Sequence, residues 1–129
     1  MKIAFGVAIA GFLGATARYG VGLLFSGSAN PAGFPWATLF VNLSGSLLLG
    51  LLTGWLAGKP SAAWASDVAG TGFLGAYTTF GAFNGQLWAM LEHRAYGAAA
   101  AYAAVSAAAG WGLAALGLSM GRKGTGRRT

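Results

Sequence analysis

Cysteine and charge are both scarce in this chain of 129 residues. It contains no cysteine, which excludes disulfides and thiolate metal sites, and only 8% of its residues are charged. Asp67 and Glu92 are the only carboxylates, and both lie near the ends of apolar stretches. A proton-coupled exporter or a rotary-ATPase proteolipid needs a carboxylate inside the membrane, so the sequence argues against these two classes. It also shows no Ser-His-Asp set, phosphate-binding loop or metal-ligand cluster.

Long apolar stretches make up most of the chain. Residues 3–25, 35–57, 68–91 and 98–120 can each cross a bilayer, because a spanning helix needs about 20 mostly apolar residues. The first stretch exceeds the usual length of a signal-peptide core, so we expect it to remain as an uncleaved span. The sequence therefore predicts an all-α membrane protein with one four-helix domain over residues 1–121. Such a small chain cannot enclose a wide pore alone, so we expect it to oligomerise.

The net charge of +6 lies mainly at the ends of these stretches and in a basic tail at residues 122–129. Lys and Arg at such places meet lipid headgroups, so we expect no nucleic-acid binding. Four spans place both termini on one side, and the count of Lys and Arg favours the cytoplasm for that side. This preference depends on the tail, which we expect to be disordered. Without the tail the count is balanced, so insertion in both orientations stays open.

A few polar side chains interrupt the apolar stretches, and each is costly in hydrocarbon, so each is a functional candidate. They are Arg18, Asn42, Ser44, Ser46, Thr78, Thr79, Asn84, Tyr102 and Ser106. Asn42 would either bond a neighbouring helix or line a polar path. Ser106 lies four residues after Tyr102. The two hydroxyls would either lie on one line of the same helix face, or Ser106 would bond back to its own helix. Arg18 would either extend to the membrane surface or line a wet vestibule.

The third stretch is the least regular. Residues 72–85 contain four glycines and the adjacent Thr78 and Thr79, all of which weaken a helix interior. A break there would expose carbonyl oxygens, which suit an alkali cation and must face protein or a polar cavity. An unbroken helix with glycines for packing is the alternative. Phe80 and Phe83 share a helix face, either as lipid-facing or core rings or as ring edges that partly replace the water around an anion.

With these residues the chain resembles the Fluc (CrcB) family of fluoride channels. The resemblance is carried by residues 11–19 (GFLGATARY), 41–46 (VNLSGS) and 72–75 (GFLG), followed by Thr78, Thr79, Phe80 and Phe83. Three of the four stretches match in the right order, and the fourth matches less distinctly. Together these motifs are specific, although each one alone is weak.

The resemblance implies an antiparallel, dual-topology dimer of four-helix subunits, with a break in the third helix and two fluoride pathways. The positions that would line a pathway are Asn42, Thr79, Phe80, Phe83, Tyr102 and Ser106, with the two phenylalanines as the family's phenylalanine box. Arg18 would stand in a vestibule. The main-chain carbonyls of Gly75 and Thr78 would hold a structural sodium ion at the dimer interface.

The chain departs from the family pattern at Gly81 and Ala82, where the family usually has two hydroxyl residues (Thr-Thr-Phe-Ser-Thr-Phe). Thr79, a water molecule or a partner subunit would have to replace those hydroxyls. The resemblance implies passive export of fluoride across the plasma or inner membrane, which reduces fluoride toxicity, by a protein that is not an enzyme. The alternatives are a small multidrug-type proton-coupled exporter and a non-conducting subunit of a heteromeric channel, paired with a paralogue.

Overall fold

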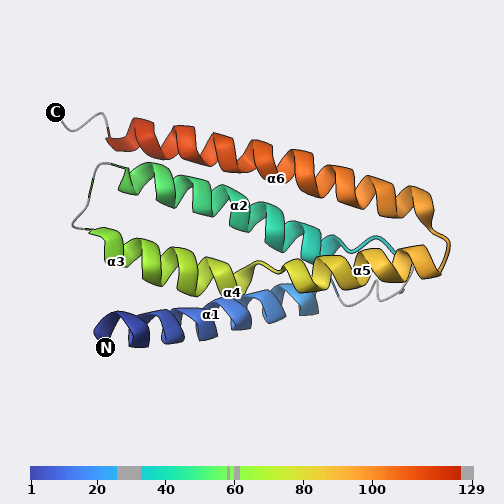
Figure 1. Cartoon of the computed structure of the whole chain (residues 1–129), viewed down its shortest axis with the longest axis horizontal. Helices are drawn as coiled ribbons and strands as arrows, with labels where there is room; N and C mark the ends of the chain where they lie inside the picture. Colours follow the sequence, from blue (N-terminus) through green and yellow to red (C-terminus); the bar gives the residue numbers. More distant parts are fainter. Residues whose placement is uncertain (26–32, 58, 60–61, 126–129) are drawn as a thin grey trace.

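The computed structural model describes residues 1–25, 33–57, 59 and 62–125, and this part of the chain forms helices and no strands (Figure 1). Three helices are long and apolar enough to cross a membrane: α1 (Lys2–Leu24), α2 (Trp36–Leu56) and α6 (Tyr96–Thr125). The third predicted span is divided into α3 (Ala63–Ala65), a π-helical segment η3 (Ser66–Leu74), α4 (Gly75–Tyr77) and α5 (Phe80–Glu92). The prediction of an all-α fold with a broken third span is therefore confirmed for the described residues.

The spans lie side by side in the order α6, α2, the broken third span and α1 (Figure 1). α2 packs along α6 on one side and touches η3 and α4 on the other, whereas α1 packs against η3 and α4. The N-terminus and the C-terminal end of α6 lie at the same end of the molecule, as four spans predict. The break between α4 and α5 lies about midway along the third span, so it faces α2 at a depth far from either end.

Small residues let the helices approach closely. A methyl group on Gly117 of α6 would collide with the carbonyl oxygen of Leu47 in α2, and one on Gly14 of α1 would collide with the carbonyl oxygen of Phe73 in η3. In lipid, helices associate through such packing and through hydrogen bonds, because lipid tails are as apolar as the side chains. These two glycine seams, one between α6 and α2 at Gly117 and one between α1 and η3 at Gly14, hold α2 and the third span in fixed register with their neighbours.

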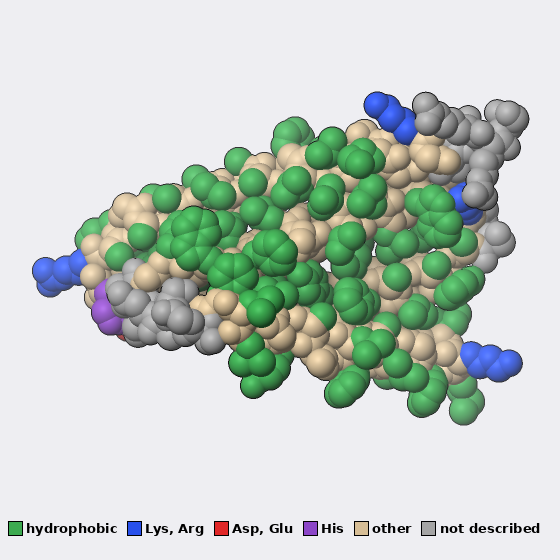
Figure 2. All heavy atoms as spheres, turned by 180° about the vertical axis from the view of Figure 1, so that it is seen from behind, with side chains coloured by type: hydrophobic (Ala, Val, Ile, Leu, Met, Phe, Trp, Pro, Cys, Tyr) green, Lys and Arg blue, Asp and Glu red, His purple; other side chains and the backbone are tan. Residues whose placement is uncertain are grey.

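Large apolar side chains cover the outside of the molecule. Figure 2 shows hydrophobic side chains along its length and Lys and Arg at its ends. Phe12 is 71% exposed and Trp111 is 78% exposed, which suits a surface that contacts hydrocarbon. The buried cluster is small and lies where α2, α5 and α6 meet; its members are Leu39, Met90, Ala99 and Tyr102.

The expected boundary of the tail is wrong. α6 continues through residue 122 and ends at Thr125, while residues 126–129 lie outside the described part of the chain. Arg122 and Lys123 stand in the last turn of this helix, where cations interact favourably with the helix dipole. Thirty residues rise about 45 Å, against about 30 Å of hydrocarbon, so this end of α6 reaches the headgroup region.

Candidate functional site

The third span breaks at two residues with extended backbone. Thr78 has φ −77° and ψ 160°, and Thr79 has φ −149° and ψ 121°. The backbone N–H of Thr78 still donates to the carbonyl of Leu74, and its Oγ1 donates to the same oxygen at 3.0 Å. On the other side, Thr79 caps α5, because its Oγ1 accepts a hydrogen bond from the N–H of Ala82 at 3.2 Å. The two threonines thus end one helix and begin the next.

Asn42 of α2 supplies the hydrogen bonds that the break removes. Its Nδ2 donates to the carbonyl oxygen of Thr79 at 3.0 Å, and its Oδ1 accepts from the N–H of Thr79 at 2.8 Å. The Asn42 side chain therefore bonds a neighbouring helix segment, which was one of the two alternatives from the sequence. An amide nitrogen has two hydrogens, so one N–H of Asn42 remains for a further acceptor. Such pairing makes irregular backbone tolerable at membrane depth.

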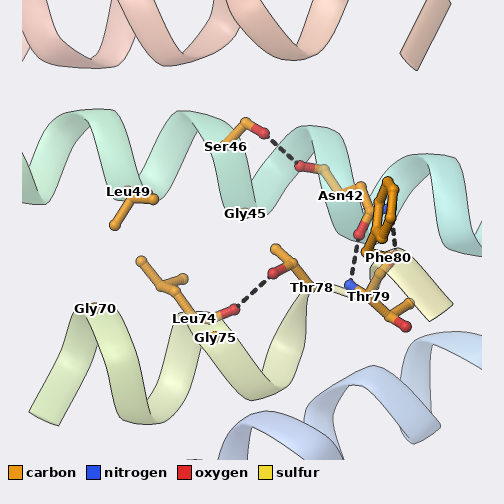
Figure 3. Close-up of a pocket in the computed structure, with 10 residues that line it drawn as sticks. All are labelled: Asn42, Gly45, Ser46, Leu49, Gly70, Leu74, Gly75, Thr78, Thr79 and Phe80. Atoms are coloured by element: carbon orange, nitrogen blue, oxygen red, sulfur yellow. Dashed lines mark hydrogen bonds between the residues drawn. The ribbon is translucent and has the colours of Figure 1, made fainter. Parts of the chain in front are cut away.

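An open hollow of about 310 Å³ lies between α2 and the third span, beside the break (Figure 3). In the close-up, Asn42 and Thr79 meet at one end of the hollow, Phe80 stands next to them, and Leu49 and Leu74 point toward each other further along. The residues that line it are Asn42, Gly45, Ser46, Leu49, Gly70, Leu74, Gly75, Thr78, Thr79 and Phe80. The hollow therefore brings together four residues that the sequence predicted for the site: Asn42, Gly75, Thr78 and Thr79, with the Phe80 ring at its edge.

The break leaves main-chain oxygens without partners. In an unbroken helix the N–H of Thr79 would bond the carbonyl of Gly75, but it bonds Asn42 instead. The N–H of Ala82 would likewise reach Thr78, but it bonds the Thr79 hydroxyl. Among the described residues, no donor therefore reaches the carbonyl oxygens of Gly75 and Thr78. These two residues both line the hollow, and free carbonyl oxygens are the hard ligands that alkali cations prefer.

Three aromatic rings continue from the break toward the buried cluster. The ring centroids of Phe80 and Phe83 are 5.9 Å apart with an interplanar angle of 21°, and those of Phe83 and Tyr102 are 5.0 Å apart at 42°. Phe80 is 74% exposed, whereas Phe83 is half-buried and Tyr102 is completely buried. The two phenylalanines thus lie next to each other, as their spacing predicts, and the ring of Phe80 is the more exposed of the two.

Tyr102 belongs to a hydrogen-bonded chain that links α6, α5 and α2. Its hydroxyl donates to Oε1 of Gln86 at 3.1 Å, and Nε2 of Gln86 donates to Oγ1 of Thr38 at 2.8 Å. Sequence reasoning missed both Gln86 and the buried Thr38. A signal was present for Gln86, since it is the only glutamine of the chain and lies within an apolar stretch. Nothing in the sequence connected these three residues.

Ser106 and Arg18 stand apart from this chain. Ser106 lies one turn after Tyr102 and is half-buried. Its hydroxyl makes no hydrogen bond within the described residues, so it does not bond back to α6 there.

Arg18 is half-buried on α1, one turn beyond Gly14, which packs against η3 and the N–H of Tyr77. It precedes the end of α1 by six residues, or about 9 Å, which a long side chain nearly spans.

Comparison with known proteins places the chain among its relatives. The model of the family described as CrcB-like protein, Camphor Resistance (CrcB), matches residues 5–118. A fluoride-specific ion channel FluC from Hyphomonas neptunium is 44% identical over 119 residues, which are 91% of this chain and 93% of that protein. One from Bordetella petrii is 45% identical over 114 residues, covering 88% and 86%. A fluoride-specific ion channel FluC 2 from Bacillus licheniformis is 40% identical over 126 residues, covering 98% and 92%.

The family match includes the break, the hollow and the aromatic rings, and the relatives match over nearly their whole lengths. The helices of the structure and these matches agree on a multi-pass membrane protein. The chain belongs to the CrcB-like family.

Proposed function

We propose that the chain is a fluoride-selective channel that passively exports fluoride across the cell membrane and so reduces fluoride toxicity. The observation that carries the proposal is the identity of 40–45% to proteins named fluoride-specific ion channels over most of both chains. The site agrees with this function, because it combines uncharged donors and aromatic rings at membrane depth and holds no group suited to bond chemistry. The protein moves an ion and is not an enzyme.

The fluoride pathway runs along the break and the aromatic rings, from the exposed ring of Phe80 to the buried Tyr102. We assign its lining to Asn42, Thr79, Phe80, Phe83, Tyr102 and Ser106. An isolated ion in low dielectric costs roughly tens of kcal/mol, so donors must follow it throughout. Asn42 keeps one N–H, and the hydroxyl hydrogens of Thr79 and Ser106 have no acceptor within the described residues. These contacts are neutral, which favours release as well as entry.

A vestibule precedes the pathway, and we place Arg18 in it. A guanidinium at this depth raises the local concentration of anions without standing in the narrow part of the path. Its position one turn beyond Gly14 on the face of α1 that packs against the third span supports this role. Ring edges of Phe80 and Phe83, which carry partial positive charge, would then take over part of the hydration shell.

A structural sodium ion fits the main-chain oxygens at the break. The residues that would hold it are Gly75 and Thr78, whose carbonyls receive no donor from the described residues and which line one hollow. Sodium prefers such neutral oxygens, and when bound it would compensate their partial negative charge. The expected result of transfer to sodium-free buffer is lower thermal stability and slower flux. A stability and flux that do not respond to sodium would refute this assignment.

Two copies in antiparallel, dual-topology arrangement would complete the site. The hollow is open on one side of the single chain, and the ring of Phe80 is 74% exposed beside it. A second copy that covers this face would supply two further carbonyls for sodium and would enclose the pathway. A heterodimer with a paralogue is the second form of this proposal. It is favoured by the cations Lys2, Arg122 and Lys123 at one end, which bias a single orientation, and by numbered relatives such as FluC 2.

Two rival functions make different demands. A proton-coupled exporter needs a carboxylate inside the membrane, but Asp67 and Glu92 are both exposed and lie near the ends of the third span. A non-conducting subunit is favoured by one observation: Gly81 leaves open space where the family has a hydroxyl. The Thr79 hydroxyl, which accepts a hydrogen bond from the N–H of Ala82, places a hydroxyl group in the same turn of α5.

Efflux from liposomes separates these functions. The chain is purified alone, reconstituted, and loaded with potassium fluoride or potassium chloride, and ion release is followed with ion-selective electrodes after valinomycin is added. A channel predicts rapid release of fluoride, little release of chloride and no need for a proton gradient. Dependence on a proton gradient would favour an exporter, and silence that ends when a paralogue is co-reconstituted would favour a subunit.

A further inference from the structure

Tyr77 occupies a buried position directly before the break. It is the last residue of α4 and is only 8% exposed. Its ring stacks on Phe73 at a centroid distance of 5.9 Å and an interplanar angle of 13°, and lies beside Gly45 of α2. Its hydroxyl lies 3.0 Å from Oγ of Ser44 in α2. The side chain of Tyr77 therefore contacts α2, while its backbone N–H lies against Gly14 of α1, where α4 ends.

The direction of the bond between Tyr77 and Ser44 follows from the other contacts of the serine. Ser44 Oγ is 2.7 Å from the carbonyl oxygen of Phe40 and 3.2 Å from that of Val41. A serine hydroxyl has one hydrogen, and carbonyl oxygens only accept, so that hydrogen goes to its own helix. Ser44 then accepts from the phenol, and Tyr77 is the donor. The phenol has no other acceptor among the described residues, so loss of Ser44 would leave a polar group unpaired in hydrocarbon.

α2 contacts three successive residues of the break through three of its own residues. Ser44 binds the side chain of Tyr77, Gly45 packs against the methyl group of Thr78, and Asn42 pairs with the backbone of Thr79. Thr78 thus lies between two hydrogen-bonded tethers, and a larger residue than Gly45 would push its side chain away. The tether on Thr79 fixes the start of α5, and the tether on Tyr77 fixes the end of α4.

We propose that Ser44 and Tyr77 form a positioning pair that fixes the free carbonyl oxygens of Gly75 and Thr78 as cation ligands. The inference rests on the proposed sodium site, and it adds two residues that act on that site without touching the ion. Thr78 follows Tyr77 directly, and Gly75 precedes it by two residues in the same short helix, so tilting α4 moves both oxygens together. The pair stands apart from the pathway residues Phe80 and Phe83, so it should tune cation affinity and leave the ion path unchanged.

The test measures thermal unfolding of the purified, detergent-solubilised chain over a series of sodium concentrations, with choline as the replacement cation. Tyr77→Phe keeps the ring and removes only the hydroxyl. Ser44→Ala removes only the oxygen that accepts the hydrogen bond of the Tyr77 hydroxyl. Each variant should need about threefold to tenfold more sodium for half-maximal stabilisation, the change equivalent to one hydrogen bond. The double variant should shift no further than either single one, and fluoride flux at saturating sodium should stay within about twofold of the parent chain. Tyr96→Phe, at a tyrosine that is 62% exposed, is the matched control and should change nothing.

Each other outcome overturns the inference in a recognisable way. A melting temperature lowered equally at every sodium concentration would mean that the pair serves packing alone. Additive shifts in the double variant would mean that the two residues act separately. A parent chain whose stability ignores sodium would remove the sodium site and this inference with it, while fluoride flux from the same preparation would still decide the channel function separately.

Discussion

Asn42 and Thr79 pair as two backbone segments would, with one hydrogen bond in each direction between a side-chain amide and a peptide group. The pairing joins residues 37 positions apart in the sequence and lies where the third span changes from one helix to the next. Because hydrocarbon offers no water to free peptide groups, a break of this kind needs a partner that both donates and accepts. A carboxamide does so with a separate N–H donor and C=O acceptor, like a second peptide group.

Replacement of Asn42 should therefore destabilise the break. Asn42→Ala leaves the N–H and the carbonyl of Thr79 unpaired, which should lower the free energy of unfolding by about 2 kcal/mol and slow fluoride efflux at least tenfold. Thermal unfolding in detergent and liposome efflux measure the two effects. Ser119→Ala is the control, because Ser119 bonds only its own helix at the carbonyl of Leu116. Normal stability of the Asn42 variant would show that the pairing contributes nothing.

The two phenylalanines should differ in their effect on stability but not in their effect on flux. Phe80→Ile and Phe83→Ile both remove an aromatic edge, so both should slow fluoride efflux while the protein still assembles. Phe80 is 74% exposed, so its replacement should leave stability unchanged, whereas Phe83 contacts Tyr102 and its replacement should cost about 1 kcal/mol. Phe12→Ile, at an exposed ring on α1, serves as control. Wild-type flux in both pathway variants would refute the ring-edge mechanism.

Gly81 allows a gain-of-function test. Outside its own helix turn, no atom of the described residues lies within 4 Å of the position that a Cβ would take, so a serine fits without strain. Gly81→Ser restores one hydroxyl of the family pattern, and we expect faster fluoride efflux with an unchanged melting temperature. Gly81→Ala adds the same carbon without the hydroxyl, so any gain that it shows would belong to helix propensity. Equal flux in the glycine, alanine and serine forms would mean that this position does not face the ion.

The seam between α2 and α6 should tolerate no added carbon. A methyl group at Gly117 would collide with the backbone of Leu47 and Leu51, so Gly117→Ala should lower the free energy of unfolding by about 1–3 kcal/mol. Gly112 lies on the same helix, and no described residue beyond its own helix turn comes within 4 Å of its Cβ position, so the same change there should be neutral or stabilise by up to about 1 kcal/mol. Thermal unfolding of the two variants side by side decides the matter. Equal behaviour would mean that the helices separate easily at this seam.

The number and order of spans could be predicted from the sequence, because about 20 consecutive apolar residues leave a helix across the bilayer as the only way to satisfy the backbone. The end of α6 could not, since the helix runs past residue 122 on backbone hydrogen bonds and a favourable dipole that hydropathy does not record. The candidate residues Asn42, Thr78 and Thr79 were also recognisable, because polar groups are costly in hydrocarbon and seldom occur there without a partner. Their roles in conduction and in sodium binding stay predictions.

Whether the third span breaks was open in the pattern of residues, since four glycines and two threonines suit either a packed helix or an interrupted one. The tertiary structure decided it by placing α2 where Asn42 donates to and accepts from Thr79 and Ser44 accepts from Tyr77, on opposite sides of Thr78. The chain Tyr102–Gln86–Thr38 likewise exists only because three helices meet at one level. Composition and periodicity report what a residue prefers in lipid, but a hydrogen bond between helices depends on the register of the two, and that register is set by the glycine seams.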